Sequence, residues 1–485
     1  MWGDIYIFFH INIFMINGKS NNLDEKNVLA KNQVGIWRST FYALATILPF
    51  GVFGFAAIGV ITYTSSAVLA FVAGYLISLV SIGIAIPFSK KVTSAGGWGA
   101  FTEAGLGKFW GYLTQWAYAG GYTVSTGALA ATTGYLTSVF VSYFFGYILP
   151  IYLVYLLDIS TIIFAFIVVR MRVRTMTFIN SIFGAVEVFA ALGISLAIIV
   201  LMGSKNTTAA VSIPSIGGIP SFFVGFIVGA LGSYAGYGTI LTLSEESKLP
   251  KKYVAKSLFI TVSLAGIVFV VGTYAIIAGY GISRLHALVS LTAPGYTVVG
   301  EYLGKITATF VIILLLIADY GTEIGLLGAA SRVYYSLARD HILPQWVGKL
   351  NHNKVPENIA GLMSLVGGIL SVGLTQIFVI IYGATDGIFY GVAVLGLFGT
   401  FVLIFYHITS SLSMPIFFKK IGKLGIYHFV LPIIAIIVFS IVLYYSLLGI
   451  TMPLTIMPIS VAIWLLIGSY IVYIRTKELK KLEGL

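Results

Sequence analysis

The hydrophobic and polar positions of this 485-residue chain alternate in long blocks. Mostly apolar stretches are separated by short segments that carry most of the charges. A helix needs about 20 apolar residues to cross the hydrocarbon core of a bilayer. Windows of that length predict twelve membrane-spanning helices, at residues 39–63, 64–88, 109–138, 148–170, 176–202, 220–243, 254–280, 306–331, 357–380, 385–410, 426–449 and 453–474.

Two of these spans contain residues that would interrupt a helix near its middle. The first holds Leu48-Pro49-Phe50-Gly51-Val52-Phe53-Gly54, and the sixth holds the glycine-rich stretch 229–238. A broken helix is tolerated at membrane depth only where it lines a cavity or is buried in protein. Paired interruptions in two halves of a chain are typical of a transporter's substrate site. Close helix packing at small residues is the alternative explanation for the spacing of Gly225, Gly229, Gly232 and Gly236.

Composition and charge narrow the class of protein. Hydrophobic residues make up 59% of the chain and charged residues only 9%, which excludes a water-soluble globular protein. The net charge of +12 is explained by basic residues on the cytoplasmic side of a membrane, so no nucleic-acid partner is expected. Cysteine is absent, and Gly18-Lys19-Ser20 lacks the earlier glycine of a phosphate-binding loop. We therefore expect no cofactor, no metal site and no enzymatic activity.

The distribution of Lys and Arg predicts the orientation of the spans. With the N-terminus in the cytoplasm, all but three of the 28 basic residues fall on the inner side. The three outer residues are Lys205, Arg284 and Lys305. This asymmetry predicts a multi-pass protein of the plasma membrane with both termini in the cytoplasm.

The apolar stretch from Ile5 to Ile16 is too short to span and has no basic region or cleavage site before it. We interpret it as a disordered or interfacial leader, with Met15 as an alternative start of translation. The predicted organisation is then a cytoplasmic tail (1–38), two halves, a pair of further helices and a second tail. The last four segments are 39–203, 220–410, 426–474 and 475–485.

Three motifs carry a family resemblance that runs from about Gly35 to Phe418. The segment Gly96-Gly-Trp-Gly-Ala-Phe101, followed by Gly105-Leu-Gly-Lys-Phe-Trp-Gly111, resembles the region between the second and third helices of amino acid–polyamine–organocation permeases. The segment from Gly236-Tyr237-Gly238 to Glu245-Glu246-Ser-Lys-Leu-Pro250 resembles their sixth-helix signature. The segment Ser331 to Pro344 is similar to their motif after helix eight.

The resemblance implies an all-α membrane fold of leucine-transporter type. Helices 1–5 and 6–10 would form a 5+5 inverted repeat in which helices 1 and 6 are discontinuous, and helices 11 and 12 would be peripheral. One departure is Gly238, where many relatives carry an acidic residue. Any role of that acid in substrate or gate contacts is therefore in question for this chain.

The expected substrate site joins the two interruptions. Free N–H groups at Val52, Phe53 and Gly54 would face an amino acid's carboxylate, and carbonyls of Ser233, Tyr234 and Ala235 would face its ammonium group. The predicted substrate-binding set is Phe50, Gly51, Val52, Phe53, Gly54, Ser233, Tyr234, Ala235, Gly236, Tyr237, Tyr118 and Tyr122. Tyr118 and Tyr122 share one face of the third span, where ordinary packing is the competing explanation. Tyr237 stands where the family often has an aromatic lid over the substrate.

Ionisable groups in the membrane are functional candidates by default. Glu187 lies in the fifth predicted span, and Asp319 and Glu323 share a face of the eighth. With no basic residue in these spans to pair with, the three acids are candidates for proton coupling. The alternative is a neutral acid bonded to a hydroxyl such as that of Thr322. Glu246 and Arg339 are candidates for an inner gate, with solvated charge as the competing interpretation.

These observations favour a secondary active transporter of amino acids that works by alternating access and symport. A proton is favoured over sodium as the coupling ion. Alternatives are a polyamine or cationic amino acid transporter of the same fold, since interior carboxylates could also hold a positive substrate. A non-transporting amino acid sensor is less favoured because both tails are short.

Overall fold

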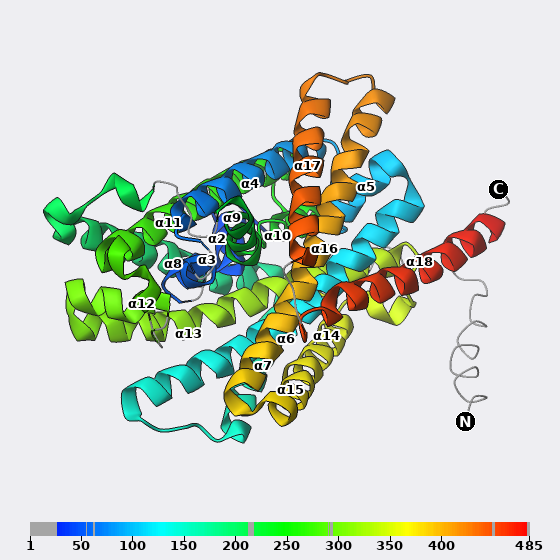
Figure 1. Ribbon diagram of the computed structural model, residues 1–485. Helices are drawn as coiled ribbons and strands as arrows, with labels where there is room; N and C mark the ends of the chain where they lie inside the picture. Colours follow the sequence, from blue (N-terminus) through cyan, green and yellow to red (C-terminus); the bar gives the residue numbers. More distant parts are fainter. Residues whose placement is uncertain are drawn as a thin grey trace.

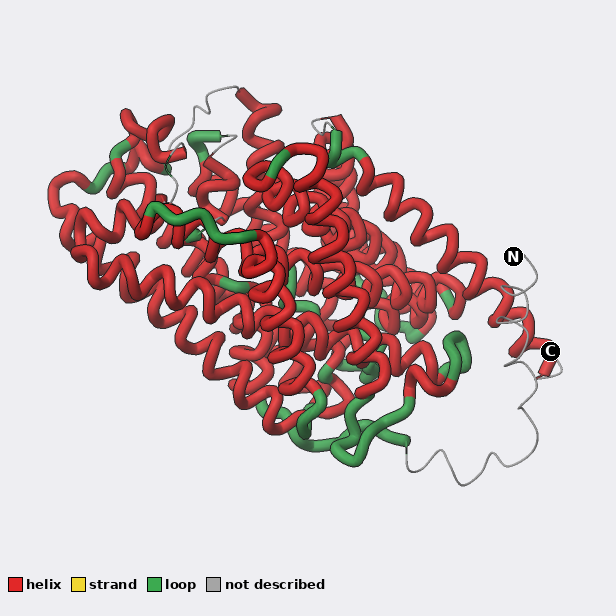
Figure 2. The backbone as a smooth tube through the Cα atoms, turned by 90° about the horizontal axis from the view of Figure 1, so that it is seen from below, coloured by secondary structure: helices red, strands yellow, loops and turns green. Residues whose placement is uncertain are grey.

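Almost the whole path of the chain is helical in the computed structural model (Figure 1). The structure describes residues 27–54, 56–61, 64–211, 218–289, 291, 294–448 and 452–482. Within these residues it contains helices and turns and no strand, as Figure 2 shows. The predicted leader at 5–16 lies outside the described residues. The prediction of an all-α fold is confirmed.

Most helices follow the predicted spans closely. Their bounds are α2 Ile36–Ile47, α3 Ala56–Ile61, α4 Ala67–Ser89, α5 Trp98–Leu106, α6 Lys108–Phe145, α7 Ile151–Val169, α8 Val173–Met202, α9 Gly218–Gly225, α10 Thr239–Thr242, α11 Pro250–Tyr280, α12 Leu285–Val289, α13 Pro294–Arg339, α14 Glu357–Ile369, α15 Thr375–Tyr382, α16 Ala384–Lys420, α17 Tyr427–Leu448 and α18 Ile456–Leu482. Helix α13 is kinked at Gly304, whose backbone is not helical.

Among the described residues, eleven helices are long and apolar enough to cross a membrane. They match eleven of the twelve predicted spans. The remaining prediction, 220–243, falls on the short elements α9, η4 (Phe226–Leu231) and α10, whose helical path is interrupted. The chain is therefore a multi-pass membrane protein.

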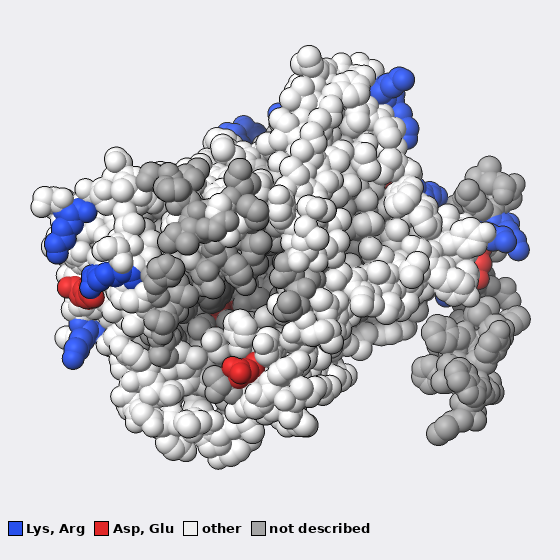
Figure 3. Space-filling view, viewed as in Figure 1, with Lys and Arg blue, Asp and Glu red and all other residues white. Residues whose placement is uncertain are grey.

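The surface agrees with this environment. In Figure 3 most of the visible face lacks charged residues, and the Lys and Arg side chains gather towards its edges. Large apolar side chains stand exposed along the spans, among them Phe189, Ile306 and Ile380. Exposing such side chains to water would cost free energy, whereas in a bilayer they contact apolar lipid chains.

Packing against α6 organises the centre of the molecule. This 38-residue helix lies against α5, α13 and α16, and its outer side meets α18. The contact with α18 is a stack of Trp116 on Trp464, with ring centroids 4.3 Å apart. On the other side, α2 packs between α8 and α11. These contacts bring the two interrupted segments into the interior.

Candidate functional site

The first interruption follows from one proline. Pro49 disfavours a right-handed helical conformation at the residue before it, and Leu48 adopts the left-handed region with φ 58°. Helix α2 therefore ends at Ile47, and the chain continues as the 3₁₀-helix η1, Pro49–Phe53, and then as α3. All five residues of η1 are buried.

The expected free amides are all occupied in this conformation, because Val52 and Phe53 belong to the 3₁₀-helix η1, whose N–H groups bond within the helix. The Gly51 N–H donates to the Leu48 carbonyl at 2.9 Å, and the Gly54 N–H donates to the Gly51 carbonyl at 3.0 Å. The expectation of free N–H groups at Val52, Phe53 and Gly54 is therefore wrong for this conformation, because the 3₁₀ turns satisfy all three. A ligand carboxylate would have to open these turns to reach them.

The second interruption lies between η4 and α10. Here η4 is a π-helix, and turns replace the regular helix from Tyr234 to Gly238. Within the described segment, the turn hydrogen bonds end on the carbonyls of Leu231, Gly232, Gly236, Tyr237 and Gly238. None of these turn bonds ends on the carbonyls of residues 233–235, the group expected to face an ammonium ion.

The two interruptions lie side by side. A Cβ atom placed on Gly236 would lie 2.9 Å from the Thr46 carbonyl oxygen, just before the first break. One placed on Gly229 would lie 3.3 Å from the Ala56 carbonyl oxygen, just after that break. The segments therefore run antiparallel in close contact, and the two breaks face each other between these contact points.

Side chains of the second interruption point in different directions. The Ser233 hydroxyl donates to the Gly229 carbonyl of its own segment. The Tyr234 hydroxyl donates to the Phe71 carbonyl of α4 at 2.9 Å, and its ring packs on Phe269 of α11. Ala235 is half-buried. In this segment the backbone rather than the side chains faces α2.

The hydroxyl of Tyr237 points towards α16. It hydrogen-bonds Nε2 of His407 on that helix at 2.7 Å. Both residues line a cavity of about 10 Å³, room for about one water molecule, together with Ser81 and Phe439. In this conformation α16 supplies a polar partner for the hydroxyl, and the role of Tyr237 as a lid over a substrate stays a prediction.

Tyr118 and Tyr122 of α6 lie in the same aromatic cluster. Their rings are 4.4 Å apart, and Tyr118 meets Tyr406 of α16 edge-on at 5.0 Å. Both side chains are buried, and their hydroxyls interact with each other. Trp98 completes the cluster through its stack on Tyr406. Packing and a polar role are thus combined in these two residues.

Gly238 is closely covered by this cluster. A Cβ atom there would lie 2.6 Å from Nε1 of Trp98 and 3.2 Å from the Tyr118 hydroxyl. The indole is held by Phe101, Tyr406 and His407 and cannot easily move aside. An acidic side chain at 238 has no room in this conformation, so Trp98 occupies its place.

The three acids of the predicted coupling set are buried. Asp319 and Glu323 lie on α13 and Glu187 on α8, each at most 3% exposed. Thr133 donates to Oδ2 of Asp319 at 3.1 Å. Within the described chain, neither oxygen of Glu323 has a hydrogen-bond partner, whereas the Glu187 carboxyl lies within reach of the Phe50 backbone in the first interruption. The Thr322 hydroxyl instead donates to the Ala45 carbonyl at 2.8 Å, so the alternative of a hydroxyl-bonded acid holds for Asp319, with Thr133 rather than Thr322 as the donor.

Two ion pairs join the loop after α10 to α13. Glu246 receives bonds from Nε and Nη2 of Arg332, the latter at 3.2 Å, and both side chains are fully buried. Glu245 pairs with Arg339 at 3.0 Å, nearer to solvent. The two predicted gate residues, Glu246 and Arg339, therefore take different partners. Solvated charge, the competing interpretation, does not fit the buried Glu246–Arg332 pair.

Burial and pairing act on Glu246 in opposite directions. Removal from water raises the pKa of the Glu246 carboxyl above its usual value, and the Arg332 guanidinium opposes that rise. Arg332 also donates to the Gly328 carbonyl at 2.8 Å. The pair is thus extensively hydrogen-bonded, as a buried pair must be if it is to persist.

Two ionisable residues of the interior escaped the sequence analysis. His407 lies in the apolar middle of α16, and Asp158 lies in α7 with Oδ2 accepting from Ser371 at 3.0 Å. Both stand inside apolar stretches of the sequence, which was a sufficient signal to single them out. Their partners, by contrast, come from distant parts of the chain.

Interrupted helical segments in contact, buried acids and a buried ion pair define a membrane transport protein. The chain belongs to the amino acid permease family, whose sequence profile matches residues 34–467. This family and the relatives below indicate a transporter rather than an enzyme.

Two relatives support this family assignment. An uncharacterized transporter of Mycobacterium tuberculosis, Rv1999c, is 22% identical over 330 residues, which cover 67% of this chain and 70% of the relative. The branched-chain amino acid permease BcaP of Lactococcus lactis is 27% identical over 142 residues, 28% of each chain. Both are similar to this chain at a level typical of distant members of one family.

Replacement of Gly54 by leucine is expected to lower the free energy of unfolding by about 1–3 kcal/mol through overpacking, and to abolish uptake because its side chain would fill the first interruption. A Cβ atom at Gly54 would lie 2.6 Å from Cδ2 of Leu315 on α13. Because that atom ends a flexible side chain, G54L/L315A should recover protein stability but not uptake. Surface expression and uptake of a labelled substrate are the measurements. Normal uptake by G54L would remove Gly54 from the site.

Proposed function

We propose that this protein is a secondary active transporter that moves amino acids across the plasma membrane by alternating access. The observation that carries the proposal is the contact between two interrupted segments, with the carbonyls of residues 233–235 outside the turn hydrogen bonds. Backbone groups of broken helices are the usual ligands for substrates of such carriers. The relative BcaP is named a branched-chain amino acid permease, which supports amino acids as the substrate class.

The proposed fold is the 5+5 inverted repeat. Its first half would comprise residues 39–203 with the interruption between α2 and α3, and its second half residues 220–410 with the interruption between η4 and α10. Residues 426–474 would be peripheral. The N- and C-termini would both lie in the cytoplasm, so the Glu246–Arg332 pair would close the inner side of the site.

The proposed substrate contacts use opposite charges of one amino acid. Once the 3₁₀ turns of η1 open, its carboxylate would accept hydrogen bonds from the amides of Val52, Phe53 and Gly54. Its ammonium group would donate to the carbonyls of residues 233–235. Phe50, Gly51, Gly236 and Tyr237 would shape the space between them, and Tyr118 and Tyr122 would bound it from α6.

Uptake into proteoliposomes tests the function directly. The purified protein would be given a panel of labelled amino acids in sodium-free buffer, with and without an inward proton gradient. Accumulation that requires the gradient supports a proton-driven amino acid symporter. Absence of transport under both conditions, with sodium also tested, would contradict the proposal.

Glu323, then Asp319 and Glu187, are the proposed proton carriers. Glu323 is buried and its carboxyl oxygens lack hydrogen-bond partners among the described residues, so its charge has little compensation there. The E323Q variant should lose gradient-driven accumulation, to a level about equal to that without a gradient, while substrate exchange across equilibrated vesicles continues. A glutamine keeps the shape and cannot release a proton.

D158N is the matched control for E323Q. Asp158 is also buried in a span, but its Oδ2 is hydrogen-bonded to Ser371 between α7 and η8 (Leu370–Leu374). We expect D158N to keep the response to the proton gradient even if its stability falls. Retained gradient-driven accumulation by E323Q would exclude Glu323 as the coupling group.

A polyamine or cationic amino acid is the second candidate substrate. The supporting observation is that Glu187, Asp319 and Glu323 form no ion pair with a Lys or Arg among the described residues. Interior carboxylates could hold a substrate's additional positive charge. Adding arginine, lysine and a polyamine to the uptake panel separates the two candidates.

A further inference from the structure

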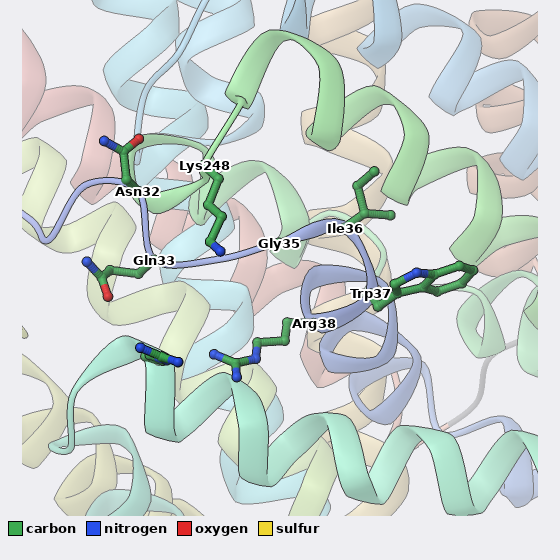
Figure 4. Close-up of a pocket in the computed structure, with 8 residues that line it drawn as sticks. Asn32, Gln33, Gly35, Ile36, Trp37, Arg38 and Lys248 are labelled. Atoms are coloured by element: carbon green, nitrogen blue, oxygen red, sulfur yellow. The ribbon is translucent and has the colours of Figure 1, made fainter.

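A cavity outside the proposed substrate site lies where α2 begins. Its volume is about 430 Å³, and Figure 4 shows its lining. The polar lining is supplied by Asn32, Gln33, Arg38, Arg174 and Lys248. In Figure 4, Lys248 and Arg38 extend into the same space beside the extended segment that leads into α2. We infer that this cavity binds a phosphate group, such as the headgroup of an anionic lipid.

The cations of this cavity lack acidic partners. Within the described residues, no carboxylate forms an ion pair with Arg38, Arg174 or Lys248. Elsewhere on the chain, Arg170 and Arg339 each pair with a glutamate. Like charges that line one cavity repel one another, and a bound anion relieves this repulsion. The lining therefore favours an anion that can accept hydrogen bonds from several side chains at once, such as a phosphate.

The depth of the cavity fits the headgroup layer of a bilayer. It lies at Ile36, where the span of α2 begins, and it includes Trp37, which is 64% exposed. Tryptophan is enriched at the interface between lipid and water. The guanidinium of Arg38 lies over the ring of Phe178, 5.6 Å from its centroid, and Phe178 is itself exposed on α8. A lipid could thus reach the cations with its phosphate while its chains remain in the hydrocarbon layer.

A bound anion here would contact cations from three elements, which meet beside the loop that carries Glu246. Arg38 lies on α2 and Arg174 on α8. Lys248 lies in the loop just after the neighbouring residues Glu245 and Glu246. That loop is tied to the segment before α2, since Val34 and Ser247 form a parallel bridge and the Lys248 N–H donates to the Val34 carbonyl at 2.9 Å. A ligand that needs all three elements together favours the conformation in which they meet. The inference that this is a cytoplasmic-leaflet site rests on the proposed orientation.

Lipid titration of the purified full-length protein tests the site. Phosphatidylglycerol and, as the neutral control, phosphatidylcholine would be titrated and bound lipid counted by native mass spectrometry. The R174Q/K248Q variant should weaken phosphatidylglycerol binding about 10- to 30-fold, the effect of about two cations near a lipid phosphate. Both side chains are exposed, so the variant should fold, and its thermal unfolding midpoint checks this.

K251Q/K252Q is the matched control because it removes two exposed cations next to Lys248 that do not line the cavity. Its phosphatidylglycerol affinity should remain within about twofold of wild type. Equal binding by wild type and R174Q/K248Q, or equal weakening by both double variants, would overturn the inference.

A titration with glycerol phosphate separates the two sources of phosphate. Stabilisation by glycerol phosphate in wild type but not in R174Q/K248Q would assign the site to soluble phosphates, and phosphatidylglycerol binding alone would assign it to lipid. Because binding is measured without transport, a failure of the amino acid proposal would not affect this result.

Discussion

Replacement of Glu246 by glutamine is expected to lower the free energy of unfolding by about 3–5 kcal/mol, the usual cost of removing one partner of a buried ion pair. The Arg332 guanidinium is fully buried, so without the carboxylate it keeps its charge in a low-dielectric interior. Glutamine preserves the shape of the side chain and removes only the charge. The thermal unfolding midpoint of the purified protein and the fraction that elutes as a single species are the measurements.

The adjacent glutamate supplies a matched control for E246Q. The Arg339 partner of Glu245 is 37% exposed, and E245Q should cost less than about 1 kcal/mol, as exposed pairs do. Glutamine at 245 can still accept from the Ala95 N–H, which Glu245 binds at 2.8 Å. A second variant, E246Q/R332M, removes the unpaired charge and should recover most of the stability. Equal losses in E245Q and E246Q would contradict the argument.

The positions of the spans could be predicted from the sequence because they depend on local composition. The predicted spans 176–202 and 254–280 correspond to α8 and α11, which begin three and four residues earlier at Val173 and Pro250. Apolar length fixes where a helix can cross a bilayer, and Pro250 at the first turn marks where α11 can begin. The first interruption was equally local, because Pro49 acts on its own neighbour.

The charge pairs could not be predicted from local pattern. Arg332 and Arg339 are seven residues apart on α13, about two turns, so they share a face and differ in depth by about 10 Å. Which of the two meets Glu246 depends on how deeply the loop after α10 inserts. That depth is set by tertiary contacts, including the bonds from the Gln33 and Val34 N–H groups to the Glu246 carbonyl.

The hydrogen-bond partner of Tyr237 could not be predicted from the sequence for a similar reason. His407 is 170 residues away in sequence, and the hydrogen bond between them exists only because α16 packs against the second interruption. A family resemblance suggested a lid over the substrate, and the structure gives the hydroxyl a partner on α16. Sequence pattern located the residue but not the direction of its side chain.

Replacement of Gly236 by alanine is expected to cost about 2–5 kcal/mol and to reduce uptake to background. The position has φ 110°, a region that costs an L-residue about 1–2 kcal/mol. The new Cβ atom would also lie 2.9 Å from the Thr46 carbonyl oxygen and 3.1 Å from the Ile47 nitrogen. These are backbone atoms that cannot turn aside, so the overpacking adds about 1–3 kcal/mol.

Variants at two other glycines separate the backbone strain expected in G236A from its overpacking. Gly383 has φ 84°, and a Cβ atom added there would meet no heavy atom of the surrounding structure within 4 Å, so G383A should show the backbone cost alone. Gly232 has a negative φ and meets only the Thr400 hydroxyl at 4.0 Å, so G232A should be close to wild type in stability and uptake. If G236A loses no more than G383A, the two interrupted segments do not need their close contact. A larger loss in G236A, with expression retained, would identify that contact as the feature on which transport depends.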